Sequence, residues 1–132
     1  MAQHLAEKIH ALTRPHGDRE NSRVKDLVDV VIIAEGSALS AQKSREALEA
    51  TFDARQTHSA PKRLPAFPRA WSPAYRRMAV EVGVKARMFE EGLEMAERFI
   101  NPLLDGSAGG SWVPEQRGWS DWRSVAELGD SL

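Results

Sequence analysis

The strongest constraint on the fold is a long series of apolar residues at helical spacing that follows the dipeptide Ser72-Pro73. Serine is a favoured N-cap residue and proline is favoured at the first helical position, so this dipeptide predicts the start of a helix. The series consists of Tyr75, Met78, Ala79, Val82, Ala86, Phe89, Leu93, Ala96 and Ile100. We expect Gly83 to divide it into two helices. We expect Asn101-Pro102 to end the second one, because the residue before a proline disfavours helical backbone.

Two stretches in the first half of the chain also predict helices. Residues 2–13 place apolar side chains at spacings of four and three residues, which is one helical face. Residues 41–54 follow Ser40, whose hydroxyl can cap a helix N-terminus. The apolar stripe of the first helix consists of Leu5, Ile9 and Leu12, and the thinner stripe of the second consists of Ala41, Ser44, Leu48, Thr51 and Phe52.

Residues 23–35 fit two kinds of secondary structure. Their β-branched residues favour a strand. Asp26 and Asp29, however, would share one face of a helix but point to opposite faces of a strand. A helix also collects an apolar stripe on the face opposite these two acids. We therefore predict a buried helix that ends at Gly36.

The last stretch, residues 103–132, is rich in glycine and carries three tryptophans, Trp112, Trp119 and Trp122. Glycine at this density opposes regular structure, whereas the large indole rings oppose free disorder. We expect an irregular tail that docks through its indoles on a helical lobe formed by residues 1–102. The predicted fold class is all-α.

Composition excludes several classes of protein. The chain has 132 residues, enough for one domain or one domain with a tail. It has no cysteine, which excludes disulfides, thiolate metal sites and a cysteine nucleophile. Its longest apolar run is far shorter than the ~20 residues of a membrane span, and its first residues do not resemble a secretory signal. We expect a cytoplasmic protein with no membrane partner.

The net charge of −1 conceals an uneven distribution of charge along the chain. Residues 43–87 contain ten basic and four acidic residues, whereas residues 88–132 contain three basic and nine acidic residues. The basic stretch predicts a positive face for nucleic-acid phosphates. The candidate RNA-binding residues are Arg55, Arg63, Arg69, Arg76 and Arg77. The alternative is a solvated surface whose charge is balanced by the acidic last third.

Three charged residues near the N-terminus are candidates for phosphate chemistry. Lys8 lies at the edge of the first apolar stripe, where a lysine either holds a polyphosphate or extends along the surface into water. Asp26 and Asp29 either face a cleft or form structural ion pairs with Arg23 or Lys25. The four histidines have no metal-ligand spacing, so no metal site is predicted from them.

An ordered series of motifs resembles the AbiEii/AbiGii-type nucleotidyltransferase toxins. The segment Ala6-Glu7-Lys8-Ile9-His10-Ala11-Leu12 resembles their lysine-bearing motif, and Arg23-Val24-Lys25-Asp26-Leu27-Val28-Asp29 resembles their R-x-K-D-x-x-D motif. The resemblance extends with less specific matches through residues 51–58, 65–71, 101–104 and 110–119. No single motif is decisive, but their order along the chain is fairly specific.

The resemblance implies a polymerase-β-like nucleotidyltransferase of a type IV toxin–antitoxin system that transfers nucleotides from an NTP to tRNA with the help of Mg²⁺. Only the C-terminal portion of such a protein is matched. Lys8 occupies the position of the family's lysine, Asp26 that of its later aspartate, and Asp29 a second acidic position. These three are therefore the candidate catalytic residues, and an antitoxin and tRNA are the implied partners.

The sequence departs from the family at its metal site. It lacks the family's Gly-Ser element and Asp-x-Asp pair, which hold Mg²⁺. Transfer in this superfamily depends on metal ions that neutralise the triphosphate. We therefore expect that this chain alone does not catalyse transfer. It would instead be a truncation, a product of a misassigned start site, or half of a split gene whose partner is the N-terminal nucleotidyltransferase half. The alternative function is that of a non-catalytic helical module that binds RNA or another protein.

Overall fold

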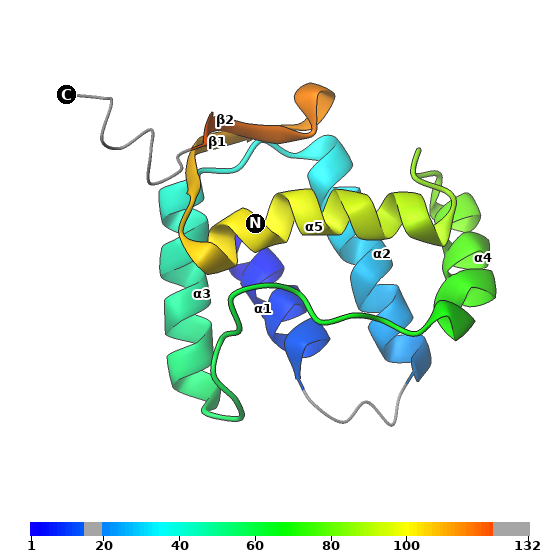
Figure 1. The fold of residues 1–132 in the computed structure, drawn as a ribbon, viewed down its shortest axis with the longest axis horizontal. Helices are drawn as coiled ribbons and strands as arrows, with labels where there is room; N and C mark the ends of the chain where they lie inside the picture. The colour runs from blue at the N-terminus through cyan, green and yellow to red at the C-terminus, as the bar shows by residue number, and fades with distance from the viewer. Residues whose placement is uncertain (15–19, 123–132) are drawn as a thin grey trace.

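The computed structural model describes the backbone of residues 1–14 and 20–122 and the side chains of residues 1–14 and 23–120 (Figure 1). Within these ranges the elements in chain order are α1 (Ala2–Thr13), α2 (Glu20–Gly36), α3 (Ala41–Arg55), the 3-10 turn η1 (Arg69–Trp71), α4 (Ser72–Val82), α5 (Phe89–Asp105), β1 (Ala108–Val113), the 3-10 turn η2 (Pro114–Gln116) and β2 (Gly118–Trp122). The predicted residues 123–132 of the tail, and the side chain of Trp122, lie outside the described part.

The first three predicted helices are confirmed. The Ser40 hydroxyl accepts a hydrogen bond from the backbone N–H of Lys43, as expected of an N-cap. The ambiguous stretch is the helix α2, and it contacts α1, α4 and α5. Because α2 buries apolar side chains against several neighbours, its β-branched residues are accommodated in spite of their strand preference.

Gly83 divides the long apolar series, as predicted, with a φ of 83° that favours glycine. The predicted end of the second helix is wrong. Helix α5 continues through Pro102 and ends at Asp105, before Gly106 with a φ of 85°. Pro102 has no N–H to bond the carbonyl oxygen of Arg98, so α5 continues past it with one hydrogen bond fewer, and Leu103 in this last turn is buried in the core.

The prediction of an all-α fold with an irregular tail is also wrong. Residues 108–122 form a two-stranded antiparallel sheet in which Trp112 pairs with Trp119. The register shifts between Gly109 and Trp112, and Gly110 has a φ of 65° there. Its glycines therefore permit an irregularity within a hairpin, while its aromatic residues favour strands.

Two indoles hold the hairpin on the helices. The Trp112 ring is fully buried, and its Nε1–H donates to the carbonyl oxygen of Ala34 in α2 at 2.7 Å. The Nε1–H of Trp119 donates to the carbonyl oxygen of Phe99 in α5 at 3.1 Å. The hairpin lies across the top of the molecule in Figure 1, beside the N-terminal end of α3. No helix in the described residues is long and apolar enough to cross a membrane.

The corner between α4 and α5 is held by polar side chains. The Tyr75 hydroxyl donates to the carbonyl oxygen of Ala86 at 2.6 Å, and the Tyr75 ring covers Gly92. The carboxylate of Glu35, in the last turn of α2, accepts from the backbone N–H groups of Lys85 and Ala86 at 2.8 and 2.9 Å. The 83–88 turn is thus fixed to α4 through Tyr75 and to α2 through Glu35.

Candidate functional site

Helices α1 and α2 bring the three candidate catalytic residues together. The Lys8 Nζ lies 3.0 Å from Oδ1 of Asp26 and 2.9 Å from Oδ2 of Asp29. The two acids reach the same lysine because they are three residues apart on one face of α2. All three side chains are about one-fifth exposed. The cluster therefore sits at the boundary between the core and solvent.

The two acids keep the lysine charged. Partial burial opposes its charge, but the hydrogen bonds that Lys8 donates to Asp29 and Asp26 outweigh this desolvation and raise the pKa of Lys8 above 10.5. Desolvation also opposes the charge of Asp29, yet hydrogen bonds from Lys8 and Lys25 lower its pKa below 3.8. The group is thus an ammonium held between carboxylates at neutral pH.

The cluster retains a capacity to bind an anion in spite of its two carboxylates. An ammonium group has three N–H donors, and the two carboxylates engage two of them. Lys25 adds a second positive charge, with its Nζ 3.1 Å from Oδ2 of Asp29. Two bases and two acids leave the cluster neutral overall, so an anion would bind through the directed third donor rather than through net charge.

The cluster does not fit the Mg²⁺ that the resemblance implies. Divalent cations of this kind are held by several oxygen ligands. The cluster has only two acids, and one oxygen of each is already engaged by Lys8. Across the described ranges, there is no group of three or more histidine or acidic side chains that could hold a metal ion. We therefore derive no step through Mg²⁺ from these residues.

The five candidate RNA-binding arginines are spread over several segments rather than gathered at one point. Arg55 ends α3 and forms an ion pair with Glu7 at 2.8 Å. Arg63 lies in the extended segment 56–68, and Arg69 lies in η1. Arg76 and Arg77 are exposed on α4. In Figure 1, the 56–68 segment crosses from the end of α3 to the start of α4, so the arginines follow this path.

A hydrogen-bonded histidine cluster, which the sequence analysis did not predict, joins α1 to the end of α3. His10 is 2% exposed, and its Nε2 lies 2.8 Å from the Thr57 hydroxyl. The same hydroxyl lies 3.0 Å from Nδ1 of His58, whose Nε2 is 2.9 Å from the Thr13 hydroxyl. Desolvation, aided by nearby positive charge, lowers the pKa of both histidines below 6.5. The adjacency of Thr57 and His58 was visible in the sequence, but their distance from His10 along the chain hid the contact.

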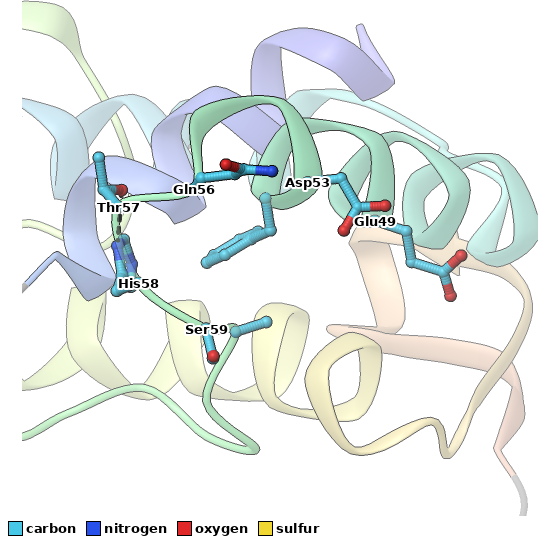
Figure 2. Close-up of a pocket in the computed structure, with 8 residues that line it drawn as sticks. Glu49, Asp53, Gln56, Thr57, His58 and Ser59 are labelled. Atoms are coloured by element: carbon cyan, nitrogen blue, oxygen red, sulfur yellow. Dashed lines mark hydrogen bonds between the residues drawn. The ribbon is translucent and has the colours of Figure 1, made fainter.

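Beside this cluster lies a hollow of about 670 Å³ (Figure 2). Figure 2 shows Glu49 and Asp53 of α3, with Gln56 just after the helix, along one side and Ser59 on the other. Phe52 lines the hollow between them. No local pattern in the sequence indicates this hollow, because it arises where the chain turns back after α3.

Comparison with known proteins identifies the family. A family model described as "Nucleotidyl transferase AbiEii toxin, Type IV TA system" matches residues 1–95. The match includes Lys8, Asp26 and Asp29, and the resemblance beyond residue 95 stays a prediction. No curated protein is matched, and no solved structure is matched. Because the model covers most of the chain, this protein belongs to the AbiEii nucleotidyltransferase toxin family of type IV toxin–antitoxin systems.

Proposed function

We propose that Lys8 binds the phosphates of an NTP during nucleotide transfer to tRNA. The observation that carries this proposal is the lysine bracketed by two acids on adjacent helices, at 3.0 and 2.9 Å. The bracket holds the ammonium in one position, and no other side chain of the described residues engages its third donor, which would meet a phosphate oxygen. A positioned cation of this kind stabilises charge that develops on a transferring phosphoryl group.

Asp26 and Asp29 act as positioning residues in this proposal. Each fixes the lysine through a charge-assisted hydrogen bond, and together they keep the ammonium protonated. The reaction would be attack of a tRNA hydroxyl on the α-phosphorus, with formation of a phosphodiester bond and release of pyrophosphate. Asp26 is also suited to orient the incoming hydroxyl, because it accepts hydrogen bonds at the boundary with solvent.

Activity would require a metal-holding element that these residues do not provide. Both acids near Lys8 are engaged by the lysine, and the sequence lacks the family's Asp-x-Asp pair. We therefore propose that the 132 residues alone do not catalyse transfer. A polypeptide that carries the Gly-Ser and Asp-x-Asp elements would supply the second half of the site.

The exposed arginines support an RNA substrate. Arg63 and Arg69 are exposed between α3 and α4, and Arg76 and Arg77 are exposed on α4 itself. We propose that they contact tRNA phosphates, with a smaller part for Arg55, which is engaged by Glu7. Such contacts predict a binding affinity that falls as the salt concentration rises.

A transfer assay tests this function. The chain is incubated with tRNA and an α-labelled NTP, alone and with an added polypeptide that carries the two missing elements. We expect label on the tRNA only in the second case, and we expect Lys8→Ala to abolish it. The matched control, Lys62→Ala, changes an exposed lysine in the 56–68 segment and should retain activity. Transfer by the chain alone, or full activity of Lys8→Ala, would contradict the proposal.

A further inference from the structure

A second hollow along α3 shares part of its lining with the hollow of Figure 2. The second has a volume of about 260 Å³ and lies between α3 and the C-terminal end of α5. Both are lined by Glu49, Phe52 and Ala60, so they are adjoining parts of one depression. We call this depression the α3 groove. It extends along α3 from Arg45 to Gln56.

The α3 groove has an apolar floor and an acidic rim. The floor is formed by Leu48, Phe52, Leu103 and Leu104. The rim carries Glu49, Asp53 and Asp105, which are all exposed. Arg45 also lines the groove and keeps its positive charge while it donates to the carbonyl oxygen of Ala108 in the hairpin, so the rim carries three acids against one base. The groove therefore complements a ligand that is both aliphatic and positively charged.

The dimensions of the groove suit an extended peptide. Eleven residue steps along α3, from Arg45 to Gln56, span about 16 Å at the helical rise. An extended chain covers this length with about five residues. Glu49 and Asp53 are separated by one helical turn, about 6 Å along the axis. Alternate residues of an extended chain are about 6.6 Å apart on the same face, so two alternate basic residues would match the two carboxylates.

One wall of the groove is held in place before any ligand binds. Segment 57–60 forms this wall, opposite α3. It is fixed to α1 through Thr57 and His58, whose hydrogen bonds reach His10 and Thr13. A preformed wall reduces the ordering cost of binding a short segment.

We propose that the α3 groove binds an extended segment of a protein partner in which basic and aliphatic residues alternate. The basic side chains pair with Glu49 and Asp53 of α3, and the aliphatic side chains of the opposite face of the segment pack on Leu104 of α5, which is partly exposed in the groove. An RNA does not fit this surface, because its phosphates would be repelled by the acidic rim. The proposal is independent of nucleotide transfer at Lys8, so either can fail alone.

Fluorescence anisotropy with a labelled synthetic peptide, Gly-Lys-Leu-Lys-Leu-Lys-Gly, tests the proposal. We expect saturable binding to the full chain. The double variant Glu49→Gln with Asp53→Asn should weaken it about fivefold or more, since each exposed ion pair contributes modestly. A peptide of the same composition in the order Gly-Lys-Lys-Leu-Leu-Lys-Gly should also bind more weakly, because no two of its lysines lie two positions apart and its charges no longer match the two carboxylates.

The matched control is the double variant Glu81→Gln with Glu97→Gln. It removes the same charge from exposed positions on α4 and α5 that do not line the groove. We expect it to bind the alternating peptide as the unchanged chain does. The proposal is overturned if no peptide binds, if both double variants weaken binding equally, or if tRNA displaces the peptide in a manner that depends on Glu49 and Asp53.

Discussion

The indole of Trp112 in β1 donates a hydrogen bond to the carbonyl oxygen of Ala34 near the end of α2, at 2.7 Å, across 78 positions of sequence. This contact joins the C-terminal hairpin to a central helix. The ring is fully buried and packs beside Phe99, with ring centroids 4.6 Å apart. The hairpin is therefore part of the core, although the sequence suggested an irregular tail.

Replacing this indole tests how much the hairpin contributes to the fold. Trp112→Phe keeps an aromatic ring but removes the Nε1–H, which leaves the Ala34 carbonyl oxygen without this donor. We expect the free energy of unfolding to fall by about 2–4 kcal/mol, from the lost hydrogen bond and the smaller ring. Urea denaturation followed by circular dichroism measures this change. A loss below 0.5 kcal/mol would show that the contact does not hold the hairpin.

The contact of Tyr75 with Gly92 predicts a second large effect. A Cβ at Gly92 would overlap the Tyr75 ring and hydroxyl, which is already fixed by its bond to Ala86. We expect Gly92→Ala to destabilise the protein by about 1–3 kcal/mol or more. In the matched control, Gly36→Ala, the added Cβ meets no atom within 4 Å, so stability should be unchanged or slightly raised. Equal effects in thermal denaturation would contradict this view of the α4–α5 corner.

The helices were predictable because their signals are local. Ser40, Ser72-Pro73 and Gly83 act through their own backbone positions, and the apolar stripes repeat within each helix. The hairpin was not predictable in this way, because its stability depends on Trp112 and Trp119 reaching helices far away in the sequence. The continuation of α5 past Pro102 was not predictable either, because it accompanies the packing of Leu103 in a core formed by distant parts of the sequence.

The candidate site was predictable only in part. The spacing of Asp26 and Asp29 placed both on one face of α2, and the family resemblance singled out Lys8. Their contact depends on how α1 packs against α2, which no local pattern specifies. The cluster of His10, Thr57 and His58 forms between α1 and the segment that follows α3, which are far apart in the sequence, and no sequence motif marks it.

The histidine cluster predicts a dependence of stability on pH. Burial lowers the pKa of both rings below 6.5. Nearby positive charge adds to this effect, from Arg14 and Arg55 at His10 and from Arg14 and Arg23 at His58. Glu7 opposes it at His10 but is outweighed. The unfolded chain therefore binds more protons as the pH falls below 6.5, so folding stability is present above this pH and is lost as the pH falls.

Urea denaturation between pH 7.5 and pH 5 measures this effect. Each histidine contributes a slope of up to about 1.4 kcal/mol per pH unit. We expect His10→Asn and His58→Asn each to flatten the dependence. A stability of the unchanged chain that stays constant over this range would contradict the neutral state of the two rings in the fold.

The ion pairs of Lys8 predict a different pH dependence. The lowered pKa of Asp29 means that its contribution to stability is present above pH 3.8 and is lost as the pH falls below that value. Asp29→Asn should cost about 1 kcal/mol near neutral pH, because Lys8 keeps its bond to Asp26. The difference between variant and unchanged chain should shrink in acid. If the stability difference persists in acid, the stability lost in Asp29→Asn comes from packing rather than from charge.

The central claim is that the ammonium of Lys8, held by Asp26 and Asp29, offers its remaining donor to the phosphates of an NTP. The most direct measurement is the NMR signal of the Lys8 Nζ during titration with ATP, beside that of the exposed Lys62. We expect the chemical shift of the Lys8 signal to change saturably with ATP, and to change more than that of Lys62. We also expect Lys8→Ala to bind ATP more weakly. An unmoved Lys8 signal, or ATP binding that Lys8→Ala leaves unchanged, would contradict the central claim.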